Sequence, residues 1–494
     1  MKNLSFALFL ILLITSNLSA QETENSYEKL ISPAGLKEDL ALLKYNLETV
    51  HAGLHLYNDK ETVDAQFAKI ESELTEPMTQ LAFHRKLTTL NKIIGNGHTG
   101  FQVSDAYHGA TQKYLPRFPF DIYRDNGEIY VVRNMSDNRK VEAGWKITTI
   151  NGKDANDIFQ ELADARGRDG QNETGPEAYV NAKFSIAYAF YYGTPDAFEM
   201  EFVDKMGKVN PITIEAIPLD RIKENRKLRY NLDFSLWYNQ GLPGLSLEMK
   251  GNKTAVLTIR TFSASLIKKT GEKTEKFFQA AFEEIEASGI EHLIVDMRGN
   301  GGGEPSVSEA LFSHLLDKPF TFYETVHSDV RKIPNPKLYQ EGAKMINLLG
   351  GLLLKENVNG TYDLKTDGLK PAKPVWPIYK KQLYVLTDGK SFSQTGETAG
   401  FFKSETNTIF IGEECGGSPV QNTSGVGLPL ELPNSKNVAI IPLILWKMNV
   451  TFENTGRGVI PDHVVKPSIE DVLGKRDVVM DYTIGLIEKG GNVN

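Results

Sequence analysis

The stretch that decides the fold runs from Leu293 to Gly303 and reads Leu-Ile-Val-Asp-Met-Arg-Gly-Asn-Gly-Gly-Gly. Its apolar start is typical of a buried strand, and the strand leads into a loop in which four of five residues are glycine. Glycines lack the Cβ atoms that hold a ligand away from the backbone, and they adopt the positive φ angles that form anion-binding nests. The loop is therefore predicted to direct backbone N–H groups at a developing negative charge.

A second strand, predicted over 383–387, leads into Asp388-Gly389-Lys390-Ser391-Phe392-Ser393 and then into a helix. A strand, a tight turn and a helix in this order form the context that presents a nucleophilic serine. The sequence thus predicts both an oxyanion hole and a nucleophile.

Strands alternate with helices around these two motifs, which indicates an α/β layered core. The other predicted strands cover 254–259, 292–296, 408–411 and 438–445, and the predicted helices cover 275–288, 306–316 and 395–403. The proline-containing segment 334–381 interrupts the alternation and is predicted to be an insertion or a lid over the site.

Positions 1–20 are typical of a secretory signal, with Lys2, an apolar run and a small-residue end at Ala20. No other stretch reaches the ~18 consecutive apolar residues of a transmembrane helix. The mature protein is therefore expected to be soluble and exported, to a periplasm or out of the cell, with no stable membrane insertion.

Composition narrows the function classes. The formal net charge is −8 over 494 residues, which argues against nucleic-acid binding because that function needs a basic face. Cys415 is the single cysteine, so no intramolecular disulfide can form and stability must come from packing.

Two regions precede the core. Apolar residues recur at helical spacing between about positions 26 and 94. Short β-type runs follow, and the run from Ala143 to Gly152 resembles the strand-turn-strand of PDZ domains, which bind chain termini by adding them as a strand. An ordinary hairpin closed by Asn-Gly is the alternative.

The serine needs a base, and His98 in Gly-Asn-Gly-His-Thr-Gly is the best candidate. A neutral histidine accepts a hydroxyl proton near pH 7 and returns it to the leaving group. A lone histidine is more often structural, so context has to decide.

The ordered combination of these motifs resembles peptidase family S41, the tail-specific or C-terminal processing proteases and their tricorn-core relatives. The motifs that carry it are Gly97-His98-Thr99, the stretch 293–303, the Ser393 turn, Gly412-Glu413 with Gly416-Gly417, and the run from Gly456 to Asp462. The resemblance implies a multidomain α/β protein whose layered serine peptidase core is of the ClpP/crotonase-like type. It divides the chain into a signal peptide (1–20), an N-terminal helical domain ending in the His-Thr motif (24–105), a PDZ-like β domain (112–215), a peptidase core (235–475), and a C-terminal helix and tail (476–494).

Two branches of that family activate the serine differently. The lysine branch places its base in a "GE.T.GKG" run, where this chain has Ser418. The tricorn-like branch uses a histidine in an "HT" run and a glutamate in an "EN.G..PD" run, which His98 and Glu453 match. The resemblance therefore implies Ser393 as nucleophile, His98 as general base and Glu453 as the residue that orients His98.

This sequence departs from the family pattern at three places. Gly97 stands where tricorn relatives carry serine, Gly396 stands where the family commonly shows glutamate, and Glu453 lies slightly farther from the Pro-Asp pair than in those relatives. Glu453 is equally well explained as a surface-loop carboxylate. Ser391 is a rival nucleophile, and Ser393 is preferred because the helical match after it then needs no gap.

By the same resemblance, the N–H of Gln394 and one from Gly301 or Gly302 would receive the oxyanion. A tight turn or a phosphate cradle is the alternative for this loop, but the Gly-Lys-Ser/Thr ending and the GxGxxG spacing of nucleotide sites are missing.

Two further motifs have ordinary explanations. His51 and His55 share a helical face, but without an HExxH glutamate or an evident third ligand they predict no metal site. Cys415 as a nucleophile would need a nearby base and a depressed pKa.

The sequence therefore predicts an exported serine endopeptidase that acts on peptides or unfolded proteins, needs no cofactor and leaves its oligomeric state open. The alternatives are a non-catalytic peptide- or ligand-binding protein on the same fold, and an esterase or amidase of small acyl compounds.

Overall fold

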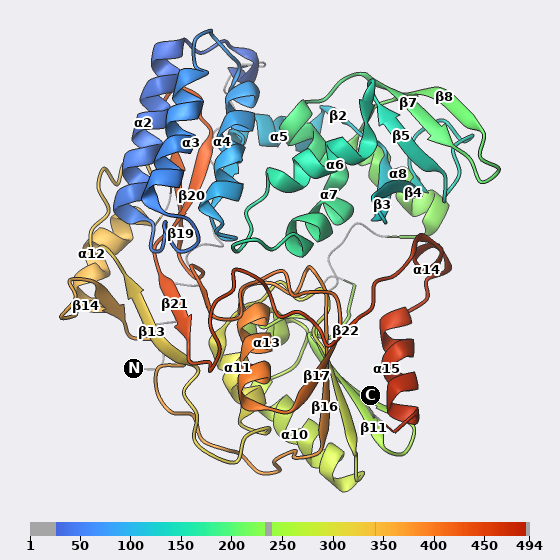
Figure 1. Ribbon diagram of the computed structural model, residues 1–494, viewed down its shortest axis with the longest axis vertical. Helices are drawn as coiled ribbons and strands as arrows, with labels where there is room; N and C mark the ends of the chain where they lie inside the picture. Colours follow the sequence, from blue (N-terminus) through green and yellow to red (C-terminus); the bar gives the residue numbers. More distant parts are fainter. Residues whose placement is uncertain (1–25, 233–239, 341, 491–494) are drawn as a thin grey trace.

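The computed structural model describes residues 26–232, 240–340 and 342–490, so the predicted signal peptide lies outside the described residues. Figure 1 shows three regions: a helical region at the upper left, a sheet domain at the upper right, and a layered α/β core below them.

Three helices, α2 (Pro33–Val50), α3 (Lys60–Ser72) and α4 (Gln80–Ile94), build the N-terminal region. Each helix begins at a side-chain cap, from Ser32, Asp59 and Thr79 respectively, as expected for residues that satisfy the free N–H groups of a first turn. Helix α4 ends at Gly95, whose φ of +63° is the left-handed conformation that stops a helix. The predicted helical pattern over 26–94 is therefore confirmed.

These helices pack on strands from the far end of the chain. Strand β1 (Gly100–Gln102) pairs with β20 (Val438–Pro442), which pairs with β19 (Gly427–Glu431). One continuous hydrophobic cluster joins the helices to the core. The N-terminal region therefore shares its hydrophobic core with residues that follow the nucleophile by more than thirty positions.

The sheet domain has a hydrophobic core of its own, built from residues between Phe118 and Ile214. Its antiparallel sheet has the order β3-β4-β5-β7-β8. The strands are β3 (Phe120–Asp125), β4 (Glu128–Asn134), β5 (Lys146–Ile150), β7 (Ala197–Val203) and β8 (Val209–Glu215), with β6 (Lys153–Asp154) beside β5.

Helices α6 (Ala155–Asp164) and α7 (Thr174–Tyr192) cover this sheet, and α7 is kinked at Lys183. Between β5 and β6, Asn151 and Gly152 both have positive φ, the conformation of a two-residue hairpin turn. The surrounding elements are η2 (Ser26–Glu28), α5 (Asp105–Lys113), β2 (Pro116–Arg117), β9 (Ile217–Pro218) and α8 (Leu219–Tyr230).

The core sheet has the order β10-β11-β12-β16-β17-β22 and is parallel from β11 onward. Its strands are β10 (Leu245–Lys250), β11 (Thr254–Ile259), β12 (His292–Asp296), β16 (Gln382–Thr387), β17 (Thr408–Gly412) and β22 (His463–Val464). The four core strands predicted between 254 and 411 are confirmed. Because parallel strands end at the same edge, the loops after β12 and β16 lie side by side.

Helices cover both faces of this sheet (Figure 1), which is why its strands are apolar on both sides. Helices α10 (Thr274–Ala287), α11 (Pro305–Phe312) and α13 (Gln394–Glu405) lie on one face, and α15 (Val478–Glu488) packs on the other. The short helix α9 (Ala264–Lys269) packs beside α10 in the core, whereas α14 (Ile469–Gly474) contacts β3 and β4 of the sheet domain.

The single strand predicted over 438–445 is wrong. The chain forms β20 and then, after two residues, β21 (Leu445–Met448), and these strands belong to different sheets. A continuous apolar run hides such a break because both strands are buried. Strand β21 pairs with β18 (Gln421–Asn422) and with β13 (Tyr323–Ser328).

The predicted insertion contains secondary structure of its own: helix α12 (Ala343–Leu353) and strands β14 (Leu354–Glu356) and β15 (Tyr362–Leu364). Strand β15 pairs with β13, so the insertion extends a sheet at the edge of the molecule (Figure 1). Its assignment as a lid stays a prediction.

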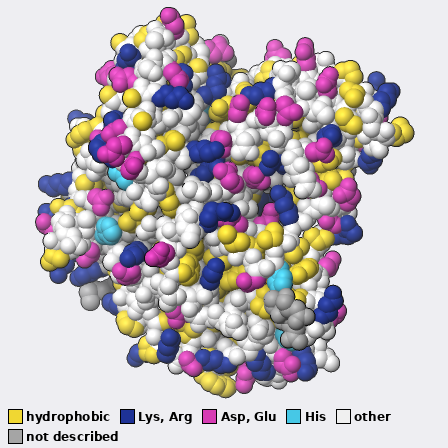
Figure 2. Space-filling view, in the orientation of Figure 1, with side chains coloured by type: hydrophobic (Ala, Val, Ile, Leu, Met, Phe, Trp, Pro, Cys, Tyr) yellow, Lys and Arg dark blue, Asp and Glu magenta, His cyan; other side chains and the backbone are white. Residues whose placement is uncertain are grey.

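On the face shown in Figure 2, Lys and Arg side chains are interspersed with Asp and Glu. Among the helices in the described part of the chain, none combines the length and the apolar character needed to cross a bilayer.

Candidate active site

Ser393 lies at a sharp turn between β16 and α13. Its φ of +56° and ψ of −126° are strained for a residue with a side chain, and its hydroxyl makes no capping bond to the helix. Such strain costs about 1–3 kcal/mol and is characteristic of functional turns. The turn is possible because a Cβ on Gly417 would lie 2.8 Å from the Ser393 nitrogen. Glycine at 417 therefore lets a second loop support the nucleophile turn.

The same loop explains Gly396. A Cβ at this position would lie 2.8 Å from the carbonyl carbon and oxygen of Gly417. The glutamate that the family commonly shows there has no room in this chain, and the departure from the pattern is a packing requirement.

Ser391, the rival nucleophile, is fully buried. Its hydroxyl donates to the carbonyl of Met297 at 3.0 Å, and its carbonyl accepts from the Gly417 N–H at 3.2 Å. These contacts give Ser391 a structural role in the turn.

His98 lies in the turn between α4 and β1, and its Nε2 is 3.1 Å from Ser393 Oγ. Asn96 shapes this turn, because its Oδ1 accepts from the N–H groups of His98 and Thr99 and from the hydroxyl of Thr423. The structure therefore brings together the two side chains that are separated by 295 positions, at hydrogen-bond distance for proton transfer.

The imidazole stacks on Phe392, with ring centroids 4.8 Å apart and an interplanar angle of 28°. His98 as a whole is half-buried, but its Nδ1 is enclosed and has no hydrogen-bond partner among the described residues. Burial lowers the pKa of His98 to about 4, so the ring is neutral at pH 7 and able to accept a proton.

Glu453 is not placed as predicted. Its side chain is exposed, and His98 Nδ1 receives no hydrogen bond in the described part of the chain. The prediction that Glu453 orients His98 is therefore not supported by the geometry. The physical reason is that stacking on Phe392 and the Asn96 turn already hold the ring, while the loop that carries Glu453 faces solvent.

The glycine loop lies against the nucleophile. A Cβ on Gly302 would be 2.9 Å from both the Gln394 nitrogen and Ser393 Cβ. Asn300 shapes the loop: its amide donates to the Ile259 carbonyl, its Oδ1 accepts from the Gly302 N–H at 2.9 Å, and its carbonyl accepts from Phe392 N–H.

The predicted oxyanion donors differ in availability. The Gly302 N–H is already donated to Asn300. Among the described residues, no acceptor takes the N–H of Gly301 or of Gln394, the first residue of α13. The helix N-terminus favours negative charge beside the Gln394 N–H, and of the two glycines only Gly301 has an N–H without an acceptor in the described part of the chain.

Ser418, at the position of the lysine-branch base, is buried, and its N–H donates to Asp169. Gly97 is explained by its neighbours: a Cβ there would lie 2.8 Å from the Phe392 ring and 3.0 Å from Asp169 Oδ1. The serine of tricorn relatives does not fit.

The remaining candidates are structural. Cys415 is buried, and burial raises the pKa of its thiol, which removes the thiolate a nucleophile needs. His51 is buried with its Nε2 2.6 Å from Thr99 Oγ1, whereas His55 is exposed. Within the described ranges, no group of acidic, histidine or cysteine side chains has the arrangement of a metal site.

The loop between α6 and α7 contributes site residues that carry no signal in the sequence. Asp169 accepts from the N–H of Gly97 at 2.7 Å and from that of Ser418 at 2.9 Å. Asn172 donates to Glu414 and to the Cys415 carbonyl. No motif marks these residues, because their partners lie far away in sequence.

A strained serine after a parallel strand, a histidine within hydrogen-bond distance and a free N–H group at a helix start form an arrangement typical of serine hydrolases. Residues 253–465, a little under half of the chain, match the model of the family described as "Peptidase family S41". The match covers the predicted peptidase core and supports a serine-type peptidase.

Solved structures are similar over nearly the whole chain. Mature CPAF matches with a TM-score of 0.62 at 15% identity, covering 93% of this chain and 99% of that one. Mature CPAF complexed with lactacystin matches with a TM-score of 0.60 at 15% identity, covering 92% and 98%. At this identity the likeness shows the fold alone. A comparison with curated protein sequences gave no match.

Proposed function

We propose that this protein is an exported serine endopeptidase in which Ser393 attacks the scissile carbonyl and His98 is the general base. The observation that carries the proposal is the 3.1 Å separation of His98 Nε2 and Ser393 Oγ. Two side chains from distant segments, one of them in a strained turn, have no structural need to meet there. The site is half-buried, so a peptide can reach the hydroxyl.

The proposed steps follow from the atoms present. The Ser393 hydroxyl donates its proton to His98 Nε2 as Oγ bonds to the carbonyl carbon, and the carbonyl oxygen becomes an oxyanion. The N–H groups of Gln394 and Gly301 would receive that charge, each worth roughly 3 kcal/mol of transition-state stabilisation. His98 then protonates the leaving amine, and water repeats the sequence on the acyl-enzyme.

The tautomer of His98 that catalysis requires, with the proton on Nδ1, is energetically unfavourable in this arrangement. If Nε2 is to accept the serine proton, the ring proton must sit on Nδ1, which is enclosed without an acceptor among the described residues. An unmet buried donor costs about 1–3 kcal/mol. The resting enzyme is therefore expected to be slow unless peptide binding supplies an acceptor.

The test is hydrolysis of quenched fluorescent casein by the mature protein, beside Ser393→Ala, His98→Ala and Ser391→Ala. The first two variants should abolish hydrolysis. Ser391→Ala should keep it and lose about 1–3 kcal/mol of stability, because the hydroxyl's bond to the Met297 carbonyl and the bond it accepts from the Asp388 N–H are both removed.

Labelling separates the alternatives. A fluorophosphonate should label the wild type and not Ser393→Ala. Failure of both labelling and hydrolysis in a folded wild type would favour the non-catalytic binding protein. Turnover of short acyl esters without casein hydrolysis would favour the esterase or amidase. Lactacystin, with which mature CPAF is found complexed, is a second probe of the serine.

Export is proposed from the signal-like positions 1–20. Fractionation of cells that express the full chain, with mass measurement of the mature N-terminus, tests it. A protein that keeps residue 1 and stays inside the cell would contradict export.

We also propose that the sheet domain recruits substrate chains by adding them beside β3, as the PDZ resemblance implies. Strand β3 pairs with β4 on one side, and α7 runs along its other side. Asn181 of α7 accepts from the Arg124 N–H at 2.8 Å, and Ser185 donates to the Phe118 carbonyl at 2.7 Å. A peptide strand would have to replace these two bonds, so recruitment is expected to require movement of α7.

A further inference from the structure

We propose that Asp169, from the sheet domain, is a positioning residue that holds the His98 turn and the support of the Ser393 turn in register through one shared carboxylate. This inference rests on the proposed serine–histidine function. It adds a third group that acts on the backbone of the site and does not contact the imidazole.

The carboxylate bridges two segments that are far apart in sequence. Oδ1 accepts from the Gly97 N–H at 2.7 Å, and Oδ2 accepts from the Ser418 N–H at 2.9 Å. Gly97 precedes His98, and Ser418 follows Gly417, which lies against the Ser393 nitrogen. One side chain thus fixes the base and the nucleophile relative to each other.

The loop that carries Asp169 is itself tightly held. Gly170 N–H donates to the Gly95 carbonyl at 2.7 Å, and a Cβ on Gly167 would lie 2.6 Å from the Thr99 carbonyl. Arg168 is fully buried and donates to the Ala163 carbonyl at 2.8 Å. The carboxylate therefore cannot shift without moving the turn of His98.

The chemistry of the contact requires an anion. Two N–H groups converge on the two oxygens, so both oxygens must accept. An asparagine offers one acceptor and turns an NH₂ group toward the other N–H. Asp169 is 1% exposed, and among the described residues only two backbone N–H groups, and no cation, contribute to the stabilisation of its charge. Burying a carboxylate without an ion pair is energetically unfavourable. A contact between neutral groups could hold the two turns together without the desolvation cost of a buried carboxylate.

The site should respond to pH through this group. Burial raises the pKa of Asp169 to about 6, against the two N–H bonds, which lower it. The titratable groups that face it are Tyr57 and Glu397, whose pKa values are raised mainly by burial and further by the charge of Asp169, and His98, one residue beyond Gly97. Protonation places a hydrogen on one of the two accepting oxygens, so the register of the turns should loosen as pH falls through about 6.

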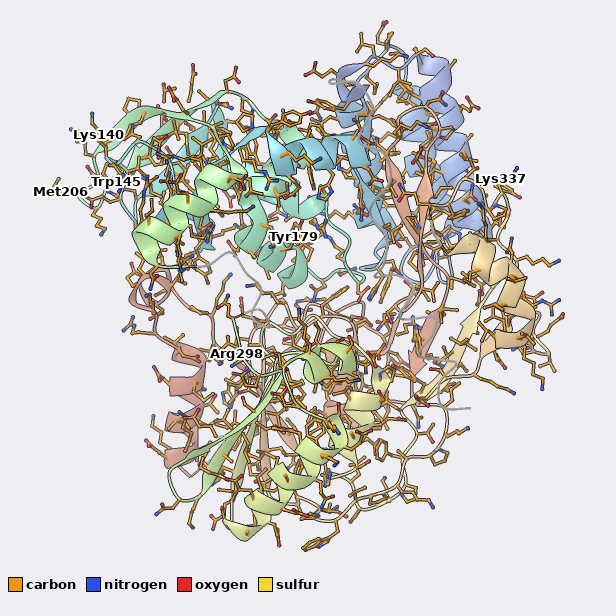
Figure 3. All side chains as sticks on the ribbon, turned by 180° about the vertical axis from the view of Figure 1, so that it is seen from behind. Lys140, Trp145, Tyr179, Met206, Arg298 and Lys337 are labelled. Atoms are coloured by element: carbon orange, nitrogen blue, oxygen red, sulfur yellow. The ribbon has the colours of Figure 1, made fainter. Side chains whose placement is uncertain are left out.

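The experiment compares wild type, Asp169→Asn and a matched control, Asp204→Asn, between pH 4.5 and 8. Asp204 also accepts two backbone N–H bonds in the sheet domain, from Met206 and Lys208, but it lies in the exposed β7–β8 turn. Met206, labelled in Figure 3, marks that turn at the far tip of the domain. Readouts are casein hydrolysis at limiting and saturating substrate, the rate of fluorophosphonate labelling, and the melting temperature.

Asp169→Asn should lower kcat and the labelling rate at pH 7.5 at least tenfold with KM within twofold, while Asp204→Asn matches the wild type. The acid limb of the wild-type kcat profile should lie near pH 6 and move toward pH 4 in Asp169→Asn, where His98 then sets it. Equal kcat in the two variants, or an unmoved acid limb, would overturn the inference.

The experiment separates failure of the proposed function from failure of the inference about Asp169. A wild type that neither hydrolyses casein nor labels refutes the proposed function itself. If Asp169→Asn does not fold, the wild-type profile decides: activity that is flat from pH 7.5 to pH 5 in protein that stays folded overturns the inference, and a limb near pH 6 supports it.

Discussion

Gly97 offers the sharpest prediction, because a methyl group at this position would contact both Phe392, which stacks on His98, and Asp169. In Gly97→Ala, the new Cβ would lie 2.8 Å from Cε2 and Cζ of Phe392 and 3.0 Å from Asp169 Oδ1. Carbon atoms prefer about 3.5–4.0 Å, so the ring must retreat by roughly 0.7 Å or the turn must move away. Because the ring stacks on His98, either movement displaces the imidazole.

The magnitude follows from that displacement. Overpacking costs about 1–3 kcal/mol of stability, whereas a misplacement of about 1 Å at a reacting group costs on the order of 10²-fold in rate. Gly97→Ala is therefore expected to reduce kcat/KM for casein about 100-fold while the protein stays folded. Casein hydrolysis measures kcat/KM, fluorophosphonate labelling measures the reactivity of the serine, and a thermal melt measures stability.

The control lies three residues away. A Cβ on Gly100 would have no heavy atom within 4 Å, so Gly100→Ala should keep both activity and stability. A double variant, Gly97→Ala with Phe392→Leu, tests the cause, because a smaller side chain removes the clash and should recover part of the loss. Activity of Gly97→Ala within twofold of the wild type would refute the reasoning.

The remaining predictions concern the groups around the dyad. Glu453→Gln should change kcat/KM less than threefold, because the carboxylate is exposed and does not meet His98; a loss of several orders of magnitude would establish that the loop closes onto His98 in the working enzyme. Asn300→Ala should lower kcat about tenfold with little change in KM, since it frees the Gly302 N–H and the Ile259 carbonyl that shape the glycine loop; an unchanged kcat would show that the loop keeps its conformation unaided. Replacing Asn181 and Ser185 together by alanine should lower KM for casein and leave the fluorophosphonate labelling rate unchanged, because both residues occupy the β3 edge; an unchanged KM would argue against strand addition there.

The local features of this fold were predictable because they depend on near neighbours. Each predicted strand from 254 to 411 is a run of apolar, β-branched residues long enough to be buried on both faces. The caps Ser32, Asp59 and Thr79 and the stop at Gly95 are equally local. The break between β20 and β21 leaves no signal in the sequence, because burial of both strands gives one unbroken apolar run.

The residues of the site also fall into two groups, those that a local sequence pattern marks and those that it does not. Its reactive members carry sequence signals: Ser393 in a strand-turn-helix context, His98 between glycines, and the glycine loop after β12. Phe392, Asp169 and Asn172 carry none, since an aromatic, an aspartate and an asparagine are ordinary residues until their partners are known. Glu453 shows the opposite case, in which a motif matches but the side chain faces solvent.

The sequence alone therefore determined which chemistry the chain can carry, because a serine at a strained turn and a backbone anion site are encoded by residues within a few positions of one another. Tertiary structure decided whether that chemistry is assembled. Residues 98, 169, 393 and 418 come from the helical region, the sheet domain and the core, and they meet only because those parts pack together (Figure 1). Distances of about 3 Å between such groups depend on long-range packing, which no local pattern records.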